Sequence, residues 1–238
     1  MHKKYPHLFS PLRVGGLVIK NRIEASPIAI PYDSPDYASM ENMVSYELRA
    51  KSGAGLIVHE EMVVNKMGDD GNGPTFEDTS LAIQDIVRES EAVHRYGGIS
   101  SVSLAHHGGW NTLAVASDGK LYAPSAIPNP YGIMTTEMTE DDIDKIVEDY
   151  ANAAAISQFA GHDMVQIHGA HGWLFSQFLS PLYNLRKDRY GGSLENRARI
   201  VLRVLDAIRK RCPGLPIEYR FSGDDHMKGG FGPDEAVE

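Results

Sequence analysis

Two histidines three residues apart, His168 and His171, are the strongest candidates for chemistry in this sequence. They lie in HGAHG, directly after the apolar run MVQI, and such a run closed by glycine is typical of a buried strand. At a strand end both rings can present nitrogens to a molecule above the sheet, and glycine lets the backbone turn sharply beside it. The pair therefore predicts a ligand site. Loop histidines that bind only backbone groups are the alternative.

A metal site and an acid–base pair are two further interpretations of the polar residues near strand ends. A metal ion needs a third and a fourth ligand, for which His106 and His107 are candidates, but no motif requires one. Glu60 and Glu61 are adjacent on a predicted strand, so their side chains point to opposite faces and cannot easily act together. A barrel hydrolase built on these groups is therefore disfavoured.

Arg220 places a positive charge on a predicted strand that is otherwise apolar or neutral after Glu218. A charge near a barrel interior is costly unless it is paired. Arg220 therefore needs a partner, and a salt bridge with an acidic neighbour such as Glu61 is the structural alternative to a ligand.

Five short apolar strands alternate with helices along the chain. The strands are predicted near residues 22–27, 56–60, 99–104, 163–168 and 217–221. Helices are predicted around 42–51, from residue 78 or 79, after the N-caps Thr139 and Ser193, and at Pro233, with a hairpin in 8–20 and an irregular excursion over 110–138. Such alternation implies a parallel sheet, and the candidate side chains follow strands, where (β/α)8 barrels carry their active sites. A Rossmann sheet is disfavoured because no G-x-G-x-x-G follows the first strand.

The composition is that of one ordinary globular domain, predicted to span residues 1–238. Its formal net charge of −9 argues against a general nucleic-acid binder, which would present a basic face. No apolar run reaches the roughly 18 residues of a membrane span, and the first residues lack the apolar stretch of a signal peptide. The single cysteine, Cys212, cannot form an internal disulfide, so a cytoplasmic location is expected.

Three segments, LFSPLRVGGLVIKNRI, HGAHG and QFLSPLYNLRKDRYGGSLENR, resemble the old yellow enzyme family of flavin-dependent oxidoreductases. The resemblance extends from about Tyr5 to the last residue and is closest to the branch that holds 2,4-dienoyl-CoA reductase and trimethylamine dehydrogenase. It implies a TIM-type (β/α)8 barrel, incomplete here with about five β/α units, FMN as cofactor, and NADH or NADPH as hydride donor. It further implies reduction of the activated C=C bond of a small unsaturated carbonyl compound: an enone, an enoate or an enoyl thioester.

By the same resemblance, His168 and His171 hydrogen-bond the carbonyl oxygen of the substrate. Hydride addition at the β-carbon pushes negative charge onto that oxygen, so two donors aimed there stabilise the transition state more than the ground state. Arg220 would lie at the N1/O2 edge of the flavin and stabilise its reduced anion. The backbone patch against the flavin ring would consist of Pro27, Ile28 and Ala29.

Four positions depart from the family pattern. Ala29 lacks the side-chain donor often found there, and Ser103 is shorter than the usual glutamine, so it would reach the flavin pyrimidine edge through water. Glu61 stands where a small neutral residue is usual, and an acid there would disfavour the reduced flavin unless Arg220 neutralises it. Trp173 replaces a tyrosine that protonates the substrate. An indole is no practical acid, so the proton would come from water or another residue, and simple packing is the alternative role for Trp173.

A closed barrel of this type has eight strands, whereas these residues predict five. In the family, the flavin phosphate is held after the seventh and eighth strands, which these residues do not include. The first and fifth strands would also have open edges, and open apolar strand edges promote association with other chains. We therefore expect the chain by itself to bind FMN weakly or not at all, and to self-associate or to need the missing part from another chain. The alternative to a reductase is thus a truncated, catalytically incompetent barrel fragment that lacks the flavin-phosphate site.

Overall fold

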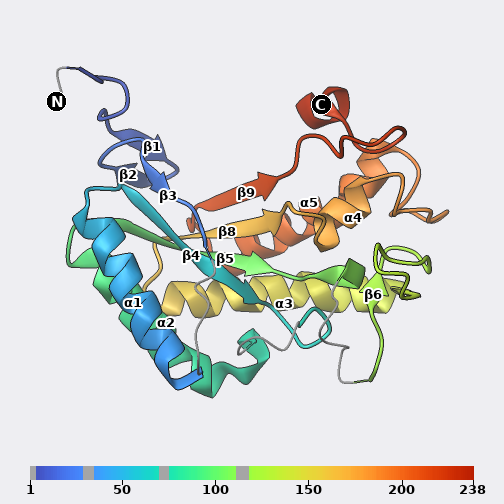
Figure 1. Ribbon diagram of the computed structural model, residues 1–238, viewed down its shortest axis with the longest axis horizontal. Coiled ribbons are helices and arrows are strands. Elements are labelled where there is room, and N and C mark those ends of the chain that lie inside the picture. The colour runs from blue at the N-terminus through green and yellow to red at the C-terminus, as the bar shows by residue number, and fades with distance from the viewer. Residues whose placement is uncertain (1–3, 29–34, 70–74, 111–117) are drawn as a thin grey trace.

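Five parallel strands form the central sheet of the computed structural model, which describes residues 4–28, 35–69, 75–110 and 118–238. The strands are β3 (Glu24–Ala25), β4 (Leu56–Val63), β5 (Ile99–Ala105), β8 (Met164–Gly169) and β9 (Ile217–Phe221). They lie side by side in chain order (Figure 1), without the reversal that characterises a Rossmann sheet. This order is that of consecutive units of a (β/α)8 barrel, so the predicted incomplete barrel of five β/α units is confirmed.

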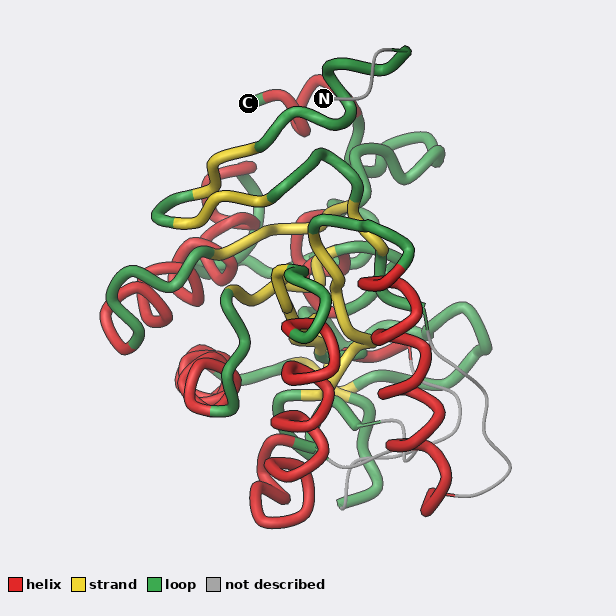
Figure 2. Tube along the Cα trace, turned by 90° about the vertical axis from the view of Figure 1, so that its left-hand side faces the viewer, coloured by secondary structure: helices red, strands yellow, loops and turns green. Residues whose placement is uncertain are grey.

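Helices connect the strands and line the outer face of the sheet (Figures 1 and 2). The longer ones are α1 (Pro35–Lys51), α2 (Thr79–His94), α3 (Glu140–Phe159) and α5 (Leu194–Arg211), and the short ones are α4 (Leu174–Leu179) and α6 (Pro233–Val237). α1 packs against α2, and α3 against α5. The largest buried cluster joins Val102 and Ile167 of the sheet to Ile143 of α3 and Val204 of α5. This apolar layer between sheet and helices is the main core.

An antiparallel hairpin of β1 (Leu12–Val14) and β2 (Leu17–Ile19) closes the amino-terminal end of the sheet. Ile19 is buried in one cluster with Leu56 and Met164, which begin their strands. A Cβ atom at Gly55 would lie 2.8 Å from the Ile19 side chain, so the hairpin can approach this closely only because glycine stands there. The hairpin predicted within residues 8–20 is therefore confirmed.

Several predicted boundaries differ from those in the structure. The strand predicted at 22–27 pairs only over Glu24–Ala25. Asn21 holds the preceding backbone in a turn, because its side chain donates to Gly53 O at 2.7 Å and accepts from Ile23 N at 3.1 Å. The strand predicted at 56–60 continues to residue 63, and the helix predicted from residue 42 begins at residue 35.

An irregularity in β4 decides which of its side chains enter the inner face. Val58 packs in the cluster on the hairpin side and His59 faces the helices, so simple alternation would turn Glu60 inward and Glu61 outward. The register with β5 shifts between His59 and Glu61. This bulge leaves Glu60 on the helix side, where it accepts a hydrogen bond from Asn42 of α1, and turns Glu61 inward.

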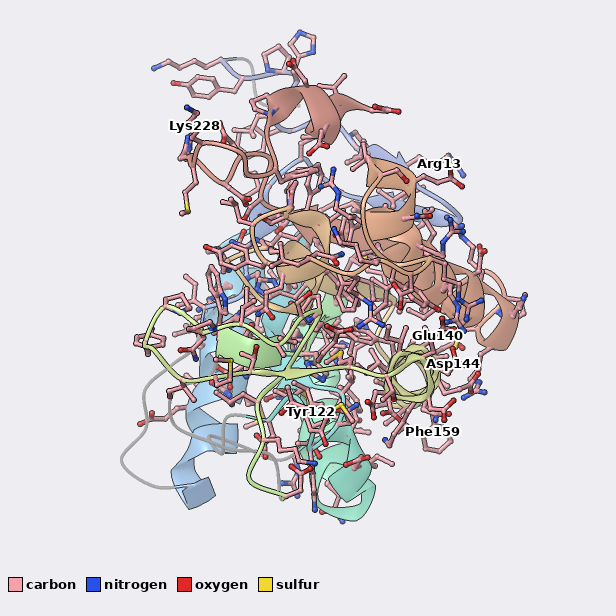
Figure 3. The ribbon with its side chains drawn as sticks, turned by 90° about the vertical axis from the view of Figure 1, so that its right-hand side faces the viewer. Arg13, Tyr122, Glu140, Asp144, Phe159 and Lys228 are labelled. Carbon is pink, nitrogen blue, oxygen red and sulfur yellow. The ribbon has the colours of Figure 1, made fainter. Side chains whose placement is uncertain are left out.

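The N-caps predicted for α3 and α5 are both confirmed. Thr139 and Asp142 form a reciprocal capping box at the start of α3, and the Ser193 side chain caps α5. Asp144, labelled on α3 in Figure 3, forms a salt bridge of 2.6 Å with Arg203 of α5. These local bonds fix where each helix begins and how the two helices face each other.

The loop between β8 and α5 is held by polar side chains of its own motif. Arg186, 6% exposed, donates to the backbone oxygens of Pro124 at 3.0 Å and Met138 at 2.6 Å, and it forms a salt bridge with Asp188. Asn184 likewise binds two backbone oxygens of the loop. Part of the specific motif therefore has a structural role, which is to tie this loop to the preceding excursion.

Residues 110–138, predicted to be irregular, contain a short pair of parallel strands in the part described from residue 118 onwards. These are β6 (Tyr122–Ala123) and β7 (Thr136–Glu137). Thr135 stabilises the turn between them, since its hydroxyl donates to Ser125 O at 2.8 Å. The prediction was wrong at this point because strands of two residues are too short to show a hydrophobic period.

Candidate active site

The two histidines of HGAHG come together at the carboxyl end of β8. His168 lies on the inner face, opposite Arg220 in the register with β9. His171 adopts a left-handed backbone with a φ of 58°, and its amide donates to Ser222 Oγ at 3.1 Å. The two rings meet, with 3.2 Å between His171 Nδ1 and His168 Nε2. The structure therefore brings the two rings of this predicted pair into contact.

Burial keeps the His168 imidazole neutral over the physiological range. Its side chain is 3% exposed, and burial lowers its pKa to about 4, although the Glu61 carboxylate acts in the opposite direction. The buried Nδ1 has no hydrogen-bond partner in the part of the chain that the structure describes, whereas Nε2 faces both Glu61 and His171. A neutral ring with its proton on Nε2 therefore has an acceptor, and one with its proton on Nδ1 has none.

Glu61 points into this cluster. Its Oε1 lies 3.2 Å from His107 Nε2, and its Oε2 lies 3.5 Å from His168 Nε2. Burial raises the pKa of this carboxyl, but the His107 hydrogen bond and the nearby histidine charges outweigh it, so that the pKa is lowered overall. Glu61 is therefore an ionised carboxylate at neutral pH.

Arg220 does not neutralise Glu61. The guanidinium approaches His171, with 3.5 Å between Arg220 Nη2 and His171 Nε2, and no described carboxylate forms an ion pair with it. The alternative of an Arg220–Glu61 salt bridge is therefore absent from the described residues. Among the described residues, this half-buried cation at the carboxyl end of the sheet has no ion-pair partner, and the Glu218 carboxylate interacts with its charge only at longer range.

A row of hydrogen-bonded side chains crosses the inner face just below the histidines. Ser103 Oγ donates to Gln166 Oε1 at 3.1 Å, and Gln166 Nε2 donates to Glu218 Oε1 at 2.9 Å. Burial raises the pKa of Glu218, helped by the charge of Glu24. The Ser103 hydroxyl proton is thus already used in the hydrogen bond to Gln166. Sequence reasoning missed Gln166, because its place between Ser103 and Glu218 depends on the register of the three strands.

Trp173 precedes α4 and packs on His107, with 4.4 Å between the ring centroids. His107 is 2% exposed and belongs to the site through both Glu61 and Trp173. The sequence singled out His106 and His107 together, without a signal that distinguished them. In the structure His106 bonds instead to the backbone amide of Gly108.

The amino-terminal part of the predicted site is described in part. Pro27 is half-buried and Ile28 is 60% exposed, just after β3, at the same end of the sheet as the histidines. Ala29 lies outside the described residues. Among the residues that are described, no three His, Cys, Asp or Glu side chains are arranged so that they could hold a metal ion.

Comparison with known proteins gives a consistent picture. Residues 7–237 match the model of the NADH:flavin oxidoreductase / NADH oxidase family. An NADH oxidase from Thermoanaerobacter brockii is 34% identical over 95% of this chain and 35% of its own length. An NADPH dehydrogenase from Bacillus licheniformis is 35% identical over 94% of this chain and 66% of its own length. The chain thus spans about one third to two thirds of these curated relatives.

Solved structures show the same architecture. An old yellow enzyme homologue from Zymomonas mobilis superposes with a TM-score of 0.84 at 28% identity, over 98% of this chain and 68% of that one. Morphinone reductase in complex with tetrahydroNAD gives a TM-score of 0.81 at 31% identity, over 97% of this chain and 68% of that one. In each case the sheet described here corresponds to part of a longer chain.

Proposed function

Because the chain belongs to the NADH:flavin oxidoreductase family, whose cofactors are FMN and NADH or NADPH, we propose that it reduces the activated C=C bond of a small unsaturated carbonyl compound. The substrate would be an enone, an enoate or an enoyl thioester. The observation that supports this proposal is the meeting of the His168 and His171 rings at the carboxyl end of β8. His171 Nδ1 and His168 Nε2 bond to each other at 3.2 Å, and a substrate oxygen would take the place of that bond.

The residues present suit a flavin at this place. Arg220 offers a cation that forms no ion pair with a described carboxylate. Such a cation would stabilise the negative charge that a flavin ring gains on reduction. Ile28, 60% exposed after β3, offers apolar contact for an aromatic ring. We propose further that the backbone of Pro27, Ile28 and Ala29 would lie against the flavin ring. Ser103 would face its pyrimidine edge through water, and Glu61 would lie beside the flavin.

A bound FMN would supply the hydride for the β-carbon of the substrate, and NADH or NADPH would return the flavin to its reduced form. His168 and His171 would orient the substrate carbonyl and stabilise the negative charge that develops on its oxygen. Trp173 would border the substrate without donating a proton, because an indole N–H is not an acid in this range. The proton for the α-carbon would come from water or from a neighbouring titratable group.

The test is enone reduction by the flavin-loaded protein, with NADH and NADPH compared as donors. His168→Ala and His171→Ala should each raise the barrier by about 2–4 kcal/mol, as the loss of one oxyanion donor does elsewhere. Both variants should also bind phenol-like ligands more weakly, whereas flavin reduction by the nicotinamide should change less. His7→Ala removes an exposed histidine distant in sequence from the cluster and serves as the control. Unchanged turnover and unchanged phenol binding in both variants would refute the assignment.

The alternative is a catalytically incompetent barrel fragment. A protein that holds stoichiometric yellow flavin and turns over enones would exclude it, and a colourless one would favour it.

Within the described residues, no helix has both the length and the apolar character needed to cross a bilayer. A cytoplasmic location and the absence of nucleic-acid and membrane partners are part of the proposal.

A further inference from the structure

Glu61 places a carboxylate among the ring nitrogens that the proposed function assigns to a substrate oxygen. His168 Nε2 lies 3.2 Å from His171 Nδ1 but also 3.5 Å from Glu61 Oε2. The other oxygen of the carboxylate is 3.2 Å from His107 Nε2. An anion that belongs to the protein itself therefore bonds to His107 and lies beside the His168 nitrogen.

The charges around Glu61 leave it negative. The titratable groups that face it are His107 after β5, and His168 and His171 at and after the end of β8. Tyr150 of α3 is fully buried. Its pKa is raised mainly by burial, and the charge of Glu61 adds to this effect. The Arg220 guanidinium lies on the far side of His171 and forms no ion pair with Glu61. The Glu61 side chain is 33% exposed, so solvent reaches it and can supply protons.

A second negative oxygen at His168 would be a like charge close to Glu61. Two acids that share one site do not both stay ionised, because the second charge raises the proton affinity of the first. Glu61 repels the oxygen of a neutral carbonyl compound only as negative charge develops on that oxygen during the reaction. It repels a ligand that is already an anion from the moment of binding.

We propose that Glu61 is a specificity-determining residue. Its carboxylate lies beside the histidine pair, so a negatively charged ligand oxygen can bind there only if the site takes up a proton at the same time. The proton comes from solvent and is taken up by the group formed by Glu61, His107 and His168, so that the net charge of the occupied site does not change. Of the substrate classes in the proposed function, neutral enones and enoyl thioesters are thereby favoured over enoate anions, and phenolates are disfavoured as well. The inference rests on the proposed function for the identity of the site, and it adds the charge selection.

Acetate is the probe, because it is a small anion with the same carboxylate group as the Glu61 side chain. Binding to the flavin-loaded full chain is followed by flavin absorbance and by the histidine ring resonances, which need no flavin. Calorimetry at about pH 7 in two buffers with different ionisation enthalpies gives the number of protons taken up. We expect wild-type protein to take up nearly one proton for each acetate bound. In Glu61→Gln the uptake should fall towards zero. Acetate should then bind about 500-fold more tightly at pH 7, because the wild-type carboxyl has to take up its proton roughly 2.7 pH units above the usual pKa of glutamic acid.

The control is Glu60→Gln, which changes the same residue type one position earlier on the opposite face, where Glu60 bonds to Asn42. It should behave like wild type in both measurements. Glu61→Asp keeps the charge and should keep the proton uptake. Acetate binding to wild type without proton uptake would overturn the proposal by itself, and so would equal affinities in wild type and Glu61→Gln.

The two proposals fail in different ways. Enone reduction without proton-linked acetate binding would leave the reductase assignment standing and remove the role of Glu61. Proton-linked binding that depends on Glu61, in a protein without enone turnover, would do the reverse.

Discussion

Arg220 carries a half-buried charge at the edge of the sheet, and among the described residues its guanidinium hydrogen-bonds to the His171 ring and forms no ion pair. If it faces the flavin as proposed, the reduced anion loses its cation in Arg220→Ala. The flavin reduction potential should then fall by roughly 20–60 mV, for a partly screened charge. Reductive titration against a reference dye measures this shift. Arg13→Ala, on the exposed side of the hairpin (Figure 3), should leave the potential where it was. An unchanged potential in Arg220→Ala would leave Arg220 a structural role only.

His59 belongs to a second polar cluster, on the outer face of β4. Its Nδ1 lies 3.2 Å from Glu89 and its Nε2 lies 2.9 Å from Ser100 Oγ, which also contacts His162 Nδ1 at 2.9 Å. The order acid, histidine, serine is that of a hydrolase triad. Ser100 is completely buried, however, and His59 stacks on Tyr46 of α1, with 4.0 Å between the centroids. This cluster therefore stabilises the packing of helices on the sheet and does not meet a substrate.

The His59 cluster makes stability depend on pH. Burial lowers the pKa of His59 to about 3 and also lowers the pKa of His162. The unfolded chain binds a proton near pH 6.5, so the stabilisation is present above that pH and is lost as the pH falls towards 3. At pH 5, His59 alone should account for a loss of about 2 kcal/mol relative to pH 7. Urea unfolding at both values measures it. His59→Gln should reduce the pH dependence by that amount, and an undiminished dependence would exclude His59 as its source.

At the scale of elements, Arg186 tests whether the loop motif before α5 is structural. Arg186→Met leaves the backbone oxygens of Pro124 and Met138 without their donor and Asp188 without its cation. The free energy of unfolding should fall by roughly 3 kcal/mol. Arg189→Met is the matched control, since Arg189 is 54% exposed and pairs on the surface with Glu140. Its loss should be much smaller. Equal losses in the two variants would contradict a structural role specific to Arg186.

At the scale of the whole molecule, the sheet has two open edges. β3 pairs only with β4, and β9 pairs only with β8, among the described strands. Unpaired strand edges template association with other strands. A polypeptide of residues 1–238 by itself should therefore self-associate. We also expect it to hold FMN weakly until another chain supplies the remaining strands, and that complemented form is the one to use in the flavin-loaded experiments. Sedimentation gives its mass in solution, and absorbance gives its flavin stoichiometry. A monomer with one flavin per chain would show that five units suffice.

Local sequence signals determined much of this architecture. Thr139 and Ser193 cap their helices because the bonds involved span only three residues. The alternation of strand and helix determined the parallel sheet and its order, because such crossovers leave little topological choice. Once the strands were parallel, side chains that follow them had to share one end of the sheet, and this brought His168, His171 and Arg220 together.

Tertiary structure decided what no local pattern encodes. The bulge between His59 and Glu61 arises from pairing with β5, and it reverses the face that alternation assigns to Glu61. The contact of Glu61 with His107 joins residues 46 positions apart, so no spacing in the chain could predict it. Short elements such as β3 and β6 depend on hydrogen bonds to distant segments rather than on their own periodicity. The sequence by itself therefore determined which end of the sheet carries the site. Only the three-dimensional register decided which charges meet there, because a shift of one residue moves a side chain to the opposite face.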